Sequence, residues 1–185
     1  MEIVTLRKIK ADEEKKHIGR KFIIEILGVS KKDHMDCIVM EYVANGSLYD
    51  YLGQKREQQQ PLGNDQFFNW TQQGALAIQY LHELDIIHRD IKSPNFLITD
   101  KHNFKLCDFG ISCISDKTVT TTYTGSLPWM APESFEAFFK YDGSKIKVSK
   151  RSDIYSYSVV IWEMWTCQKP EFSVKVDGMS GKIFI

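Results

Sequence analysis

Charge imbalance, long apolar runs and paired cysteine motifs are all missing from this sequence. Its 24 basic and 24 acidic side chains give a formal net charge of zero, so neither nucleic acid nor an anionic membrane is expected as the main partner. No apolar run approaches the ~20 residues of a membrane-spanning helix, and the N-terminus lacks the apolar region of a signal peptide. The cysteines show no C-x-x-C spacing, which favours reduced thiols over a metal site. We therefore expect one globular unit in the cytoplasm.

The most informative stretch is HRDIKSPNFLITDKHNFKLCDFG, which begins at His88. Two short apolar runs in it flank a polar tetrapeptide, and this pattern predicts a hairpin. If the four polar residues form the loop, Thr99 pairs with Phe104 and Asn95 lies opposite Asp108. The hairpin would then bring an amide and a carboxylate side by side at its open end.

Asp90 adds a third oxygen donor, five positions before Asn95, in a stretch that a proline keeps out of the helical conformation. Two carboxylates and an amide beside Lys92 suit a hard divalent cation and an anionic ligand. Gly110 would allow a sharp turn after Asp108. Each residue alone would be ordinary on a hairpin surface, so the functional prediction depends on the joint pattern.

The pattern H-R-D-x-K-x-x-N followed by D-F-G resembles the catalytic loop and the magnesium loop of the protein kinase superfamily. This resemblance implies an α+β, bilobal kinase-like fold that uses ATP and Mg²⁺ to phosphorylate a protein hydroxyl. It assigns Asp90 to the proton of the substrate hydroxyl and Lys92 to the γ-phosphate. It further assigns Asn95 and Asp108 to magnesium, and Leu97 to the floor under adenine.

Residues 2–9 carry apolar side chains every third position with charges between them, which predicts an amphipathic helix. The helix resembles the C helix of kinases, in which a glutamate pairs with a lysine on a small-lobe strand. The resemblance places Glu2 at the glutamate position and Leu6 at an apolar position that faces the DFG phenylalanine. The charged stretch 10–20 is expected to be a solvated loop.

The apolar runs 22–29 and 37–43 are rich in β-branched residues and predict two neighbouring antiparallel strands. The second run resembles the strand and hinge that receive adenine in kinases. The resemblance implies Met40 as the gatekeeper, and it implies that backbone groups of Glu41 and Val43 bind the purine.

Three helices are expected after the hinge. A turn at 45–47 can cap a short helix at 48–52, and a flexible insertion is expected at 54–64. Residues 67–84 predict a longer helix that resembles the kinase E helix. The apolar positions at helical spacing, which we expect in the core, are 70, 74, 77, 78 and 81.

The third helix, at 154–165, is apolar on nearly every side, so we expect it to be buried all round. Ser152 can cap it, and Asp153 suits the positive end of its dipole. It resembles the kinase F helix, in which an aspartate at the Asp153 position anchors the backbone of the catalytic loop. Ser158 stands where kinases usually carry glycine, and we expect this difference to be tolerated.

Hydroxyl side chains gather between Asp108 and Glu133, where apolar periodicity is weak. This stretch resembles a kinase activation loop, and Arg89 matches the basic residue that meets a phosphate there. The hydroxyl-bearing residues are Ser112, Ser115, Thr118, Thr120, Thr121, Thr122, Tyr123 and Thr124. Which of them is modified stays open.

Lys92 and Ser126 resemble the serine/threonine kinase pattern rather than the tyrosine kinase pattern. The run LPWM at 127–130 and the run WEMW at 162–165 resemble the tyrosine-kinase-like group of serine/threonine kinases. The resemblance therefore implies a protein substrate that is phosphorylated on serine or threonine.

The resemblance extends from the C helix to the F helix only. The sequence contains no G-x-G-x-x-G motif, and no residue matches the small-lobe lysine. We therefore expect a partial kinase domain, with residues 1–44 as a remnant of the small lobe and hinge and residues 45–185 as the large lobe. Glu133 is expected to be exposed or strained, because the arginine that pairs with it in kinases has no match.

Three functions fit these features. The first is a fragment of an active serine/threonine kinase, and the second is a truncated pseudokinase that serves as a binding module. The third is a small-molecule phosphotransferase, which shares an H-x-D-x-x-x-x-N loop. Arg89, Lys92, the Ala-Pro-Glu run and the long hydroxyl-rich segment disfavour the third. The oligomeric state stays open.

Overall fold

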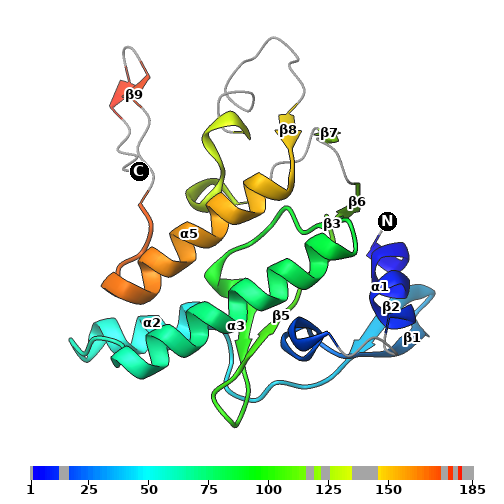
Figure 1. Ribbon diagram of the computed structural model, residues 1–185, viewed down its shortest axis with the longest axis horizontal. Helices are drawn as coiled ribbons and strands as arrows, with labels where there is room; N and C mark the ends of the chain where they lie inside the picture. The colour runs from blue at the N-terminus through cyan, green and yellow to red at the C-terminus, as the bar shows by residue number, and fades with distance from the viewer. Residues whose placement is uncertain are drawn as a thin grey trace.

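The structure is a computed structural model that describes residues 2–12, 17–115, 119–121, 126–134, 146–171, 175–176 and 179–180. Its centre is formed by two long helices, α3 (Asn64–Glu83) and α5 (Lys150–Thr166), which pack on each other. Helix α2 (Leu48–Glu57) lies at one end of this pair (Figure 1). Helix α1 (Glu2–Ala11) and the hairpin of β1 (Ile26–Lys32) and β2 (Met35–Met40) lie at the other end.

The strands of the described residues form five two-stranded antiparallel pairs. Besides β1–β2, these pairs are β3 (Ile86–Ile87) with β6 (Cys113–Ile114), β4 (Phe96–Ile98) with β5 (Phe104–Leu106), β7 (Val119–Thr121) with β8 (Ile146–Val148), and β9 (Lys175–Val176) with β10 (Met179–Ser180). The described residues also include three 3₁₀ helices: η1 (Ile18–Phe22) before β1, η2 (Ser93–Asn95) before β4, and η3 (Leu127–Trp129) between β7 and β8. Helices combined with small sheets agree with the α+β class predicted from the sequence.

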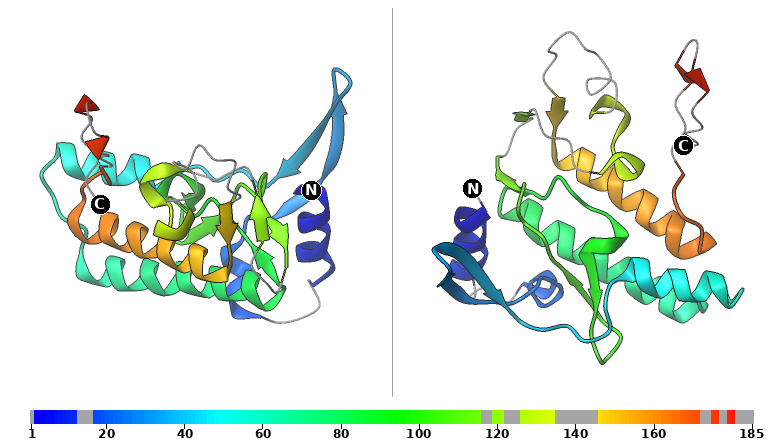
Figure 2. Two further views of the ribbon diagram at one scale, coloured as in Figure 1. Left: turned by 90° about the horizontal axis from the view of Figure 1, so that it is seen from above. Right: turned by 180° about the vertical axis from the view of Figure 1, so that it is seen from behind.

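The first helix and the two strands predicted near the N-terminus are present. Their boundaries differ, because Phe22 ends η1 instead of starting a strand, and β1 continues to Lys32. The turn between β1 and β2 consists of Asp33 and His34, which both have a left-handed backbone with φ of 51° and 64°. Figure 2 shows this hairpin extending away from the helical body.

Part of the stretch predicted to be a solvated loop is ordered against the helical body. Helix η1 packs on α3, and residues 13–16 lie outside the described part of the chain. A side chain at Gly19 would collide with the backbone of Leu76. Glycine is therefore the residue that lets η1 approach α3 so closely.

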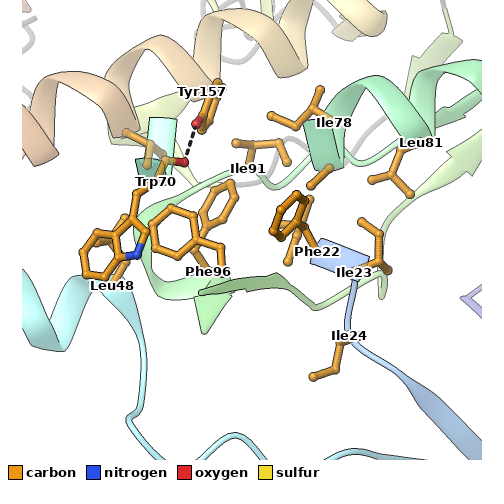
Figure 3. Packing of buried hydrophobic residues seen from close by; sticks show 14 of the residues in the cluster. Phe22, Ile23, Ile24, Leu48, Trp70, Ile78, Leu81, Ile91, Phe96 and Tyr157 are labelled. Carbon is orange, nitrogen blue, oxygen red and sulfur yellow. Dashed lines mark hydrogen bonds between the residues drawn. The ribbon is translucent and has the colours of Figure 1, made fainter. Parts of the chain in front are cut away.

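The core lies between α3, α5 and the β4–β5 hairpin, as Figure 3 shows. Trp70 stacks on Phe104 with 4.8 Å between ring centroids, and Phe96 contacts both Phe104 and Tyr157. The Tyr157 hydroxyl donates to the carbonyl oxygen of Thr71 at 2.7 Å. All five apolar positions predicted in the core from helical spacing are buried.

Three predictions about two of the helices were wrong in detail. Helix α2 continues to Glu57, so the expected flexible insertion is partly helical. Helix α5 is capped by Ser149, and Ser152 completes that cap as the third helical residue. Burial of α5 on every side was also wrong, because Ile154, Trp162 and Trp165 are 55%, 44% and 64% exposed.

The β4–β5 hairpin forms, but its register is one residue away from the prediction. Ile98 pairs with Phe104, and the Thr99 N–H donates to the Asn103 carbonyl at 2.9 Å. His102 has a left-handed φ of 54°, as expected for a three-residue hairpin loop closed by a left-handed residue. Thr99 is thus opposite Asn103 and not opposite Phe104.

Candidate active site

The backbone of residues 88–95, here called the catalytic loop, is anchored by Asp153 of α5. The Asp153 Oδ2 atom accepts from the His88 N–H and Oδ1 accepts from the Arg89 N–H, both at 2.9 Å. Arg89 has a left-handed φ of 72°, a conformation that a non-glycine residue adopts only when its surroundings enforce it. The predicted anchoring role of Asp153 is confirmed.

His88 connects the catalytic loop to the strand end before Asp108. Its Nδ1 atom accepts from the Asp90 N–H at 3.3 Å, so the ring proton is on Nε2, which donates to the Cys107 carbonyl at 3.0 Å. Burial lowers the pKa of His88, which keeps the ring neutral. The ring also packs on Phe109, with 5.1 Å between centroids.

Three polar side chains converge on Asp90, which is 8% exposed. Lys92 Nζ lies 2.7 Å from Asp90 Oδ2. The Ser126 hydroxyl donates to Asp90 Oδ1 at 3.0 Å and accepts from Lys92 Nζ at 2.9 Å. Asn95 Nδ2 donates to the Asp90 carbonyl at 2.8 Å. The structure therefore brings Asp90, Lys92 and Asn95 together, and their catalytic roles stay a prediction.

Asn95 and Asp108 are neighbours at the open end of the hairpin, although not in the predicted pairing. The Asn95 carbonyl accepts from the Cys107 N–H at 2.9 Å, so Asp108 lies one residue beyond the position opposite Asn95. The positive φ of this turn, 64°, belongs to Asp108. Among the described glycines only Gly46 has a positive φ, so Gly110 does not have the conformation that its predicted role in the turn suggested.

The donor set at Asn95 and Asp108 fits a magnesium ion. Because Nδ2 of Asn95 is used by Asp90, its Oδ1 is the atom left for a cation, and the Asp108 side chain is exposed. The described residues contain no cluster of three or more histidine, cysteine or acidic side chains suited to a metal. Two protein oxygens are nevertheless enough for Mg²⁺ when phosphate oxygens and water complete the octahedron.

The predicted purine-binding residues lie around the end of β2. Met40 is 41% exposed. The Glu41 N–H donates to the Glu25 carbonyl at 2.9 Å, so only the carbonyl of Glu41 is left for a ligand. Val43 and Leu97 are partly buried against the core. A bridge between Ser47 and Leu97 brings the hinge segment onto β4.

A cavity of about 290 Å³ is lined by Glu41, Val43 and the hairpin residues Thr99 and Asp100, among others. It lies on the loop side of the hairpin and includes neither Met40 nor Leu97. Of the predicted purine-binding residues this cavity contains Glu41 and Val43, and the adenine site stays a prediction.

Helix α1 contacts the segment that follows Phe109. Leu6 and Phe109 belong to one buried cluster, and the hydroxyl oxygens of Thr5 and Ser112 are 3.1 Å apart. The backbone of Glu2 begins the helix, but its side chain lies outside the described part of the structure. The predicted pairing of Glu2 is therefore not tested.

Part of the predicted activation loop also lies outside the described residues. This applies to Thr118, Thr122, Tyr123 and Thr124, and to the side chains of Thr120 and Thr121. Ser112 is fully buried, which makes it a poor acceptor for a modifying enzyme. Glu133 is exposed, as expected, and accepts from the Ser152 hydroxyl at 3.3 Å.

One polar residue of this region was missed from the sequence. Glu163 of α5 is 1% exposed and accepts hydrogen bonds from Ser93 and Trp129. Burial raises its pKa to about 7. The signal in the sequence was a carboxylate inside the apolar run of α5. The run WEMW at 162–165, which contains Glu163, was interpreted only as a resemblance to a known family.

Comparison with known proteins identifies the class. The family model described as protein tyrosine and serine/threonine kinase matches residues 10–183. The mitogen-activated protein kinase kinase kinase dlk-1 of Caenorhabditis briggsae is 39% identical over 157 residues, which are 84% of this chain and 17% of that protein. Mitogen-activated protein kinase kinase kinase 13 of Mus musculus is 37% identical over 176 residues, which are 91% of this chain and 17% of that protein. The chain thus spans about one sixth of the length of these relatives. Within the described residues, no helix combines the length and apolar character needed to cross a membrane.

Proposed function

The chain belongs to the protein tyrosine and serine/threonine kinase family, and from this we propose that it transfers the γ-phosphoryl group of ATP to a protein hydroxyl. The predicted kinase-like α+β fold, covering part of a kinase domain, is thereby confirmed. The observation that carries the proposal is the Asp90 carboxylate, which accepts a hydrogen bond from the Ser126 hydroxyl at 3.0 Å. A carboxylate that holds an alcohol at this distance has the geometry of a general base.

In the proposed reaction, Asp90 orients the substrate hydroxyl and accepts its proton. Lys92 Nζ lies 2.7 Å from Asp90 Oδ2. Its ammonium group can therefore neutralise charge on the phosphoryl group that is transferred to the hydroxyl held by Asp90. The side-chain amide of Asn95 fixes the backbone of Asp90 by donating to the Asp90 carbonyl oxygen. Catalysis of this type consists mainly of positioning and charge stabilisation.

ATP and magnesium are the proposed cofactors. Asn95 Oδ1 and the Asp108 carboxylate would hold the metal, which neutralises the charge of the phosphates when bound. Leu97 would form the floor under adenine, and Met40 would be the gatekeeper. The Glu41 carbonyl, rather than its N–H, would bind the purine together with the backbone of Val43. Glu2 remains the proposed partner of a phosphate-binding lysine.

We further propose a serine or threonine of another kinase as the acceptor. The hydroxyl at Ser126 and the lysine at position 92 support serine/threonine specificity, and the relatives are named as kinases that act on a mitogen-activated protein kinase kinase. All four cysteines are free, which suits a reducing compartment such as the cytoplasm. The division into a small-lobe part (1–44) and a large lobe (45–185) is part of the same proposal.

The test is phosphate transfer by the purified chain to myelin basic protein in the presence of ATP and Mg²⁺. Asp90→Asn should reduce the rate about 10²- to 10⁴-fold, the usual contribution of a general base. Asp100→Asn, which changes an exposed aspartate at the hairpin tip, should leave the rate unchanged. ATP binding without transfer by the wild-type chain would contradict the proposal and favour the truncated pseudokinase.

A further inference from the structure

The side chain of Glu163 joins two segments that are far apart in the sequence. Its Oε1 atom accepts from the Ser93 hydroxyl and its Oε2 atom accepts from the Trp129 indole N–H, each at 2.7 Å. Both donors are neutral. Among the described contacts of Glu163 no cation donates to the carboxylate, so its desolvation is offset only in part by these two hydrogen bonds.

The two donors belong to the two segments that meet at Asp90. Ser93 directly follows Lys92 in the catalytic loop. Trp129 is three residues after Ser126 in residues 126–134, here called the docking segment. Because Ser126 and Lys92 both contact the Asp90 carboxylate, the Glu163 contacts close a ring. The ring runs from Asp90 through the docking segment to α5 and back through the catalytic loop.

We propose that Glu163 is a positioning residue whose carboxylate ties Trp129 of the docking segment to Ser93 of the catalytic loop and thereby holds Ser126 and Lys92 at Asp90. The proposal deepens the proposed function, because it concerns the site at which the protein substrate would be phosphorylated. Glu163 itself does not touch Asp90 through any described contact and acts only through its two partners.

The chemistry of the two donors separates hydrogen bonding from packing. An indole N–H can only donate, whereas a hydroxyl can donate or accept. Glutamine at position 163 can therefore keep both contacts, accepting from Trp129 and donating to Ser93. Methionine fills a similar volume but accepts neither bond well. Glu163→Gln and Glu163→Met are thus a matched pair. The first keeps the hydrogen bonds that link the two segments, and the second loses them.

The first experiment measures hydrogen exchange of the docking segment by mass spectrometry in the full chain. Trp129 and Met130 have backbone N–H groups bonded to Ser126 and Leu127, both at 3.1 Å, so loosening of the segment is visible there. Glu163→Met should speed this exchange about tenfold, the equivalent of one lost hydrogen bond to a charged group. Glu163→Gln should exchange like the wild type. Equal exchange in all three proteins, or equal acceleration in both variants, would overturn the proposal.

A second variant keeps the test decisive if Glu163→Met does not fold. Trp129→Phe removes the indole N–H that Glu163 Oε2 accepts and leaves α5 unchanged, so it should also accelerate exchange of the docking segment. Glu57→Gln, on an exposed part of α2, serves as the control for loss of a carboxylate. Exchange of the docking segment that is unchanged in Trp129→Phe would contradict the proposal.

The second experiment separates positioning from stability by steady-state kinetics. Glu163→Met should raise the KM for myelin basic protein about tenfold and change the KM for ATP less than twofold, and the donors that it leaves unpaired should lower the melting temperature. A purely structural role predicts that the two KM values change together. Equal changes in the KM for myelin basic protein and the KM for ATP would therefore overturn the proposal. If the wild type transfers no phosphate, the proposed function fails, and hydrogen exchange alone then decides the role of Glu163.

Discussion

Asp153 holds Arg89 in a left-handed backbone conformation by accepting its N–H at 2.9 Å, from a helix 64 residues away in the sequence. The same carboxylate accepts the His88 N–H, also at 2.9 Å, and contacts His82 Nε2 at 2.8 Å. Three donors on one buried carboxylate define the path of the chain into Asp90. The catalytic loop therefore depends on α5 as much as on its own sequence.

Asp153→Asn should destabilise the protein and distort the catalytic loop. An amide offers one acceptor oxygen where the carboxylate offers two, so either the His88 or the Arg89 N–H loses its partner. A buried unsatisfied donor costs about 1–3 kcal/mol, and urea unfolding should show a decrease of this size. Asp100→Asn changes an exposed aspartate and should shift the midpoint little. Equal stability of the two variants would contradict the anchoring role.

Two glycines should respond oppositely to alanine. A Cβ atom at Gly74 in α3 would lie 2.7 Å from ring atoms of the buried Tyr157, and such overpacking costs about 1–3 kcal/mol. A Cβ atom at Gly53 in α2 meets nothing within 4 Å, so Gly53→Ala should stabilise by about 0.5–1 kcal/mol through helix propensity. Thermal unfolding of both variants tests this. A stabilised Gly74→Ala variant would show that α3 and α5 are less closely packed than described.

Sequence reasoning was reliable where a pattern is local. The helical spacing around Trp70 predicted the buried face of α3, because burial repeats with the helix period. The hairpin register was missed by one residue, because the left-handed conformation of His102 shortens the loop and cannot be inferred from a polar tetrapeptide. The cap of α5 was assigned to Ser152 instead of Ser149, since the two serines of a capping arrangement three residues apart are both plausible caps.

Contacts between distant segments could not be predicted from periodicity. Glu163 meets Ser93 and Trp129 across 70 and 34 residues of sequence. A charged residue in an apolar helix signals a buried partner but does not say which one. The residues around Asp90 were assigned only because their joint spacing resembles a known family.

Lys105 is expected to support nucleotide binding through the hinge. Its Nζ atom lies 2.8 Å from Glu41 Oε1, with side chains only 18% and 26% exposed, and it donates to the Ile23 carbonyl at 3.3 Å. Loss of such a pair is worth up to ~1 kcal/mol, so Lys105→Met should weaken ATP binding about fivefold in calorimetry. Lys101→Met, at the exposed hairpin tip, is the control. An unchanged ATP affinity would show that Lys105 does not support nucleotide binding through the hinge.

Glu163 should make stability depend on pH in a specific direction. Burial raises its pKa from 4.5 to about 7, so the folded protein binds this proton more tightly than the unfolded chain, and stability falls as pH rises through that window. The loss is on the order of 3 kcal/mol between pH 4.5 and 7, and Glu163→Gln should lack it.

His88 also makes stability depend on pH. Burial lowers its pKa, so its contribution to stability is lost on acidification below its ordinary pKa of ~6.5, but the wild type and Glu163→Gln share this loss. The difference in unfolding free energy between Glu163→Gln and the wild type, measured in urea at pH 5 and pH 8, isolates Glu163. It should favour the variant at pH 8, and a constant difference would mean that Glu163 is hydrated in the folded state.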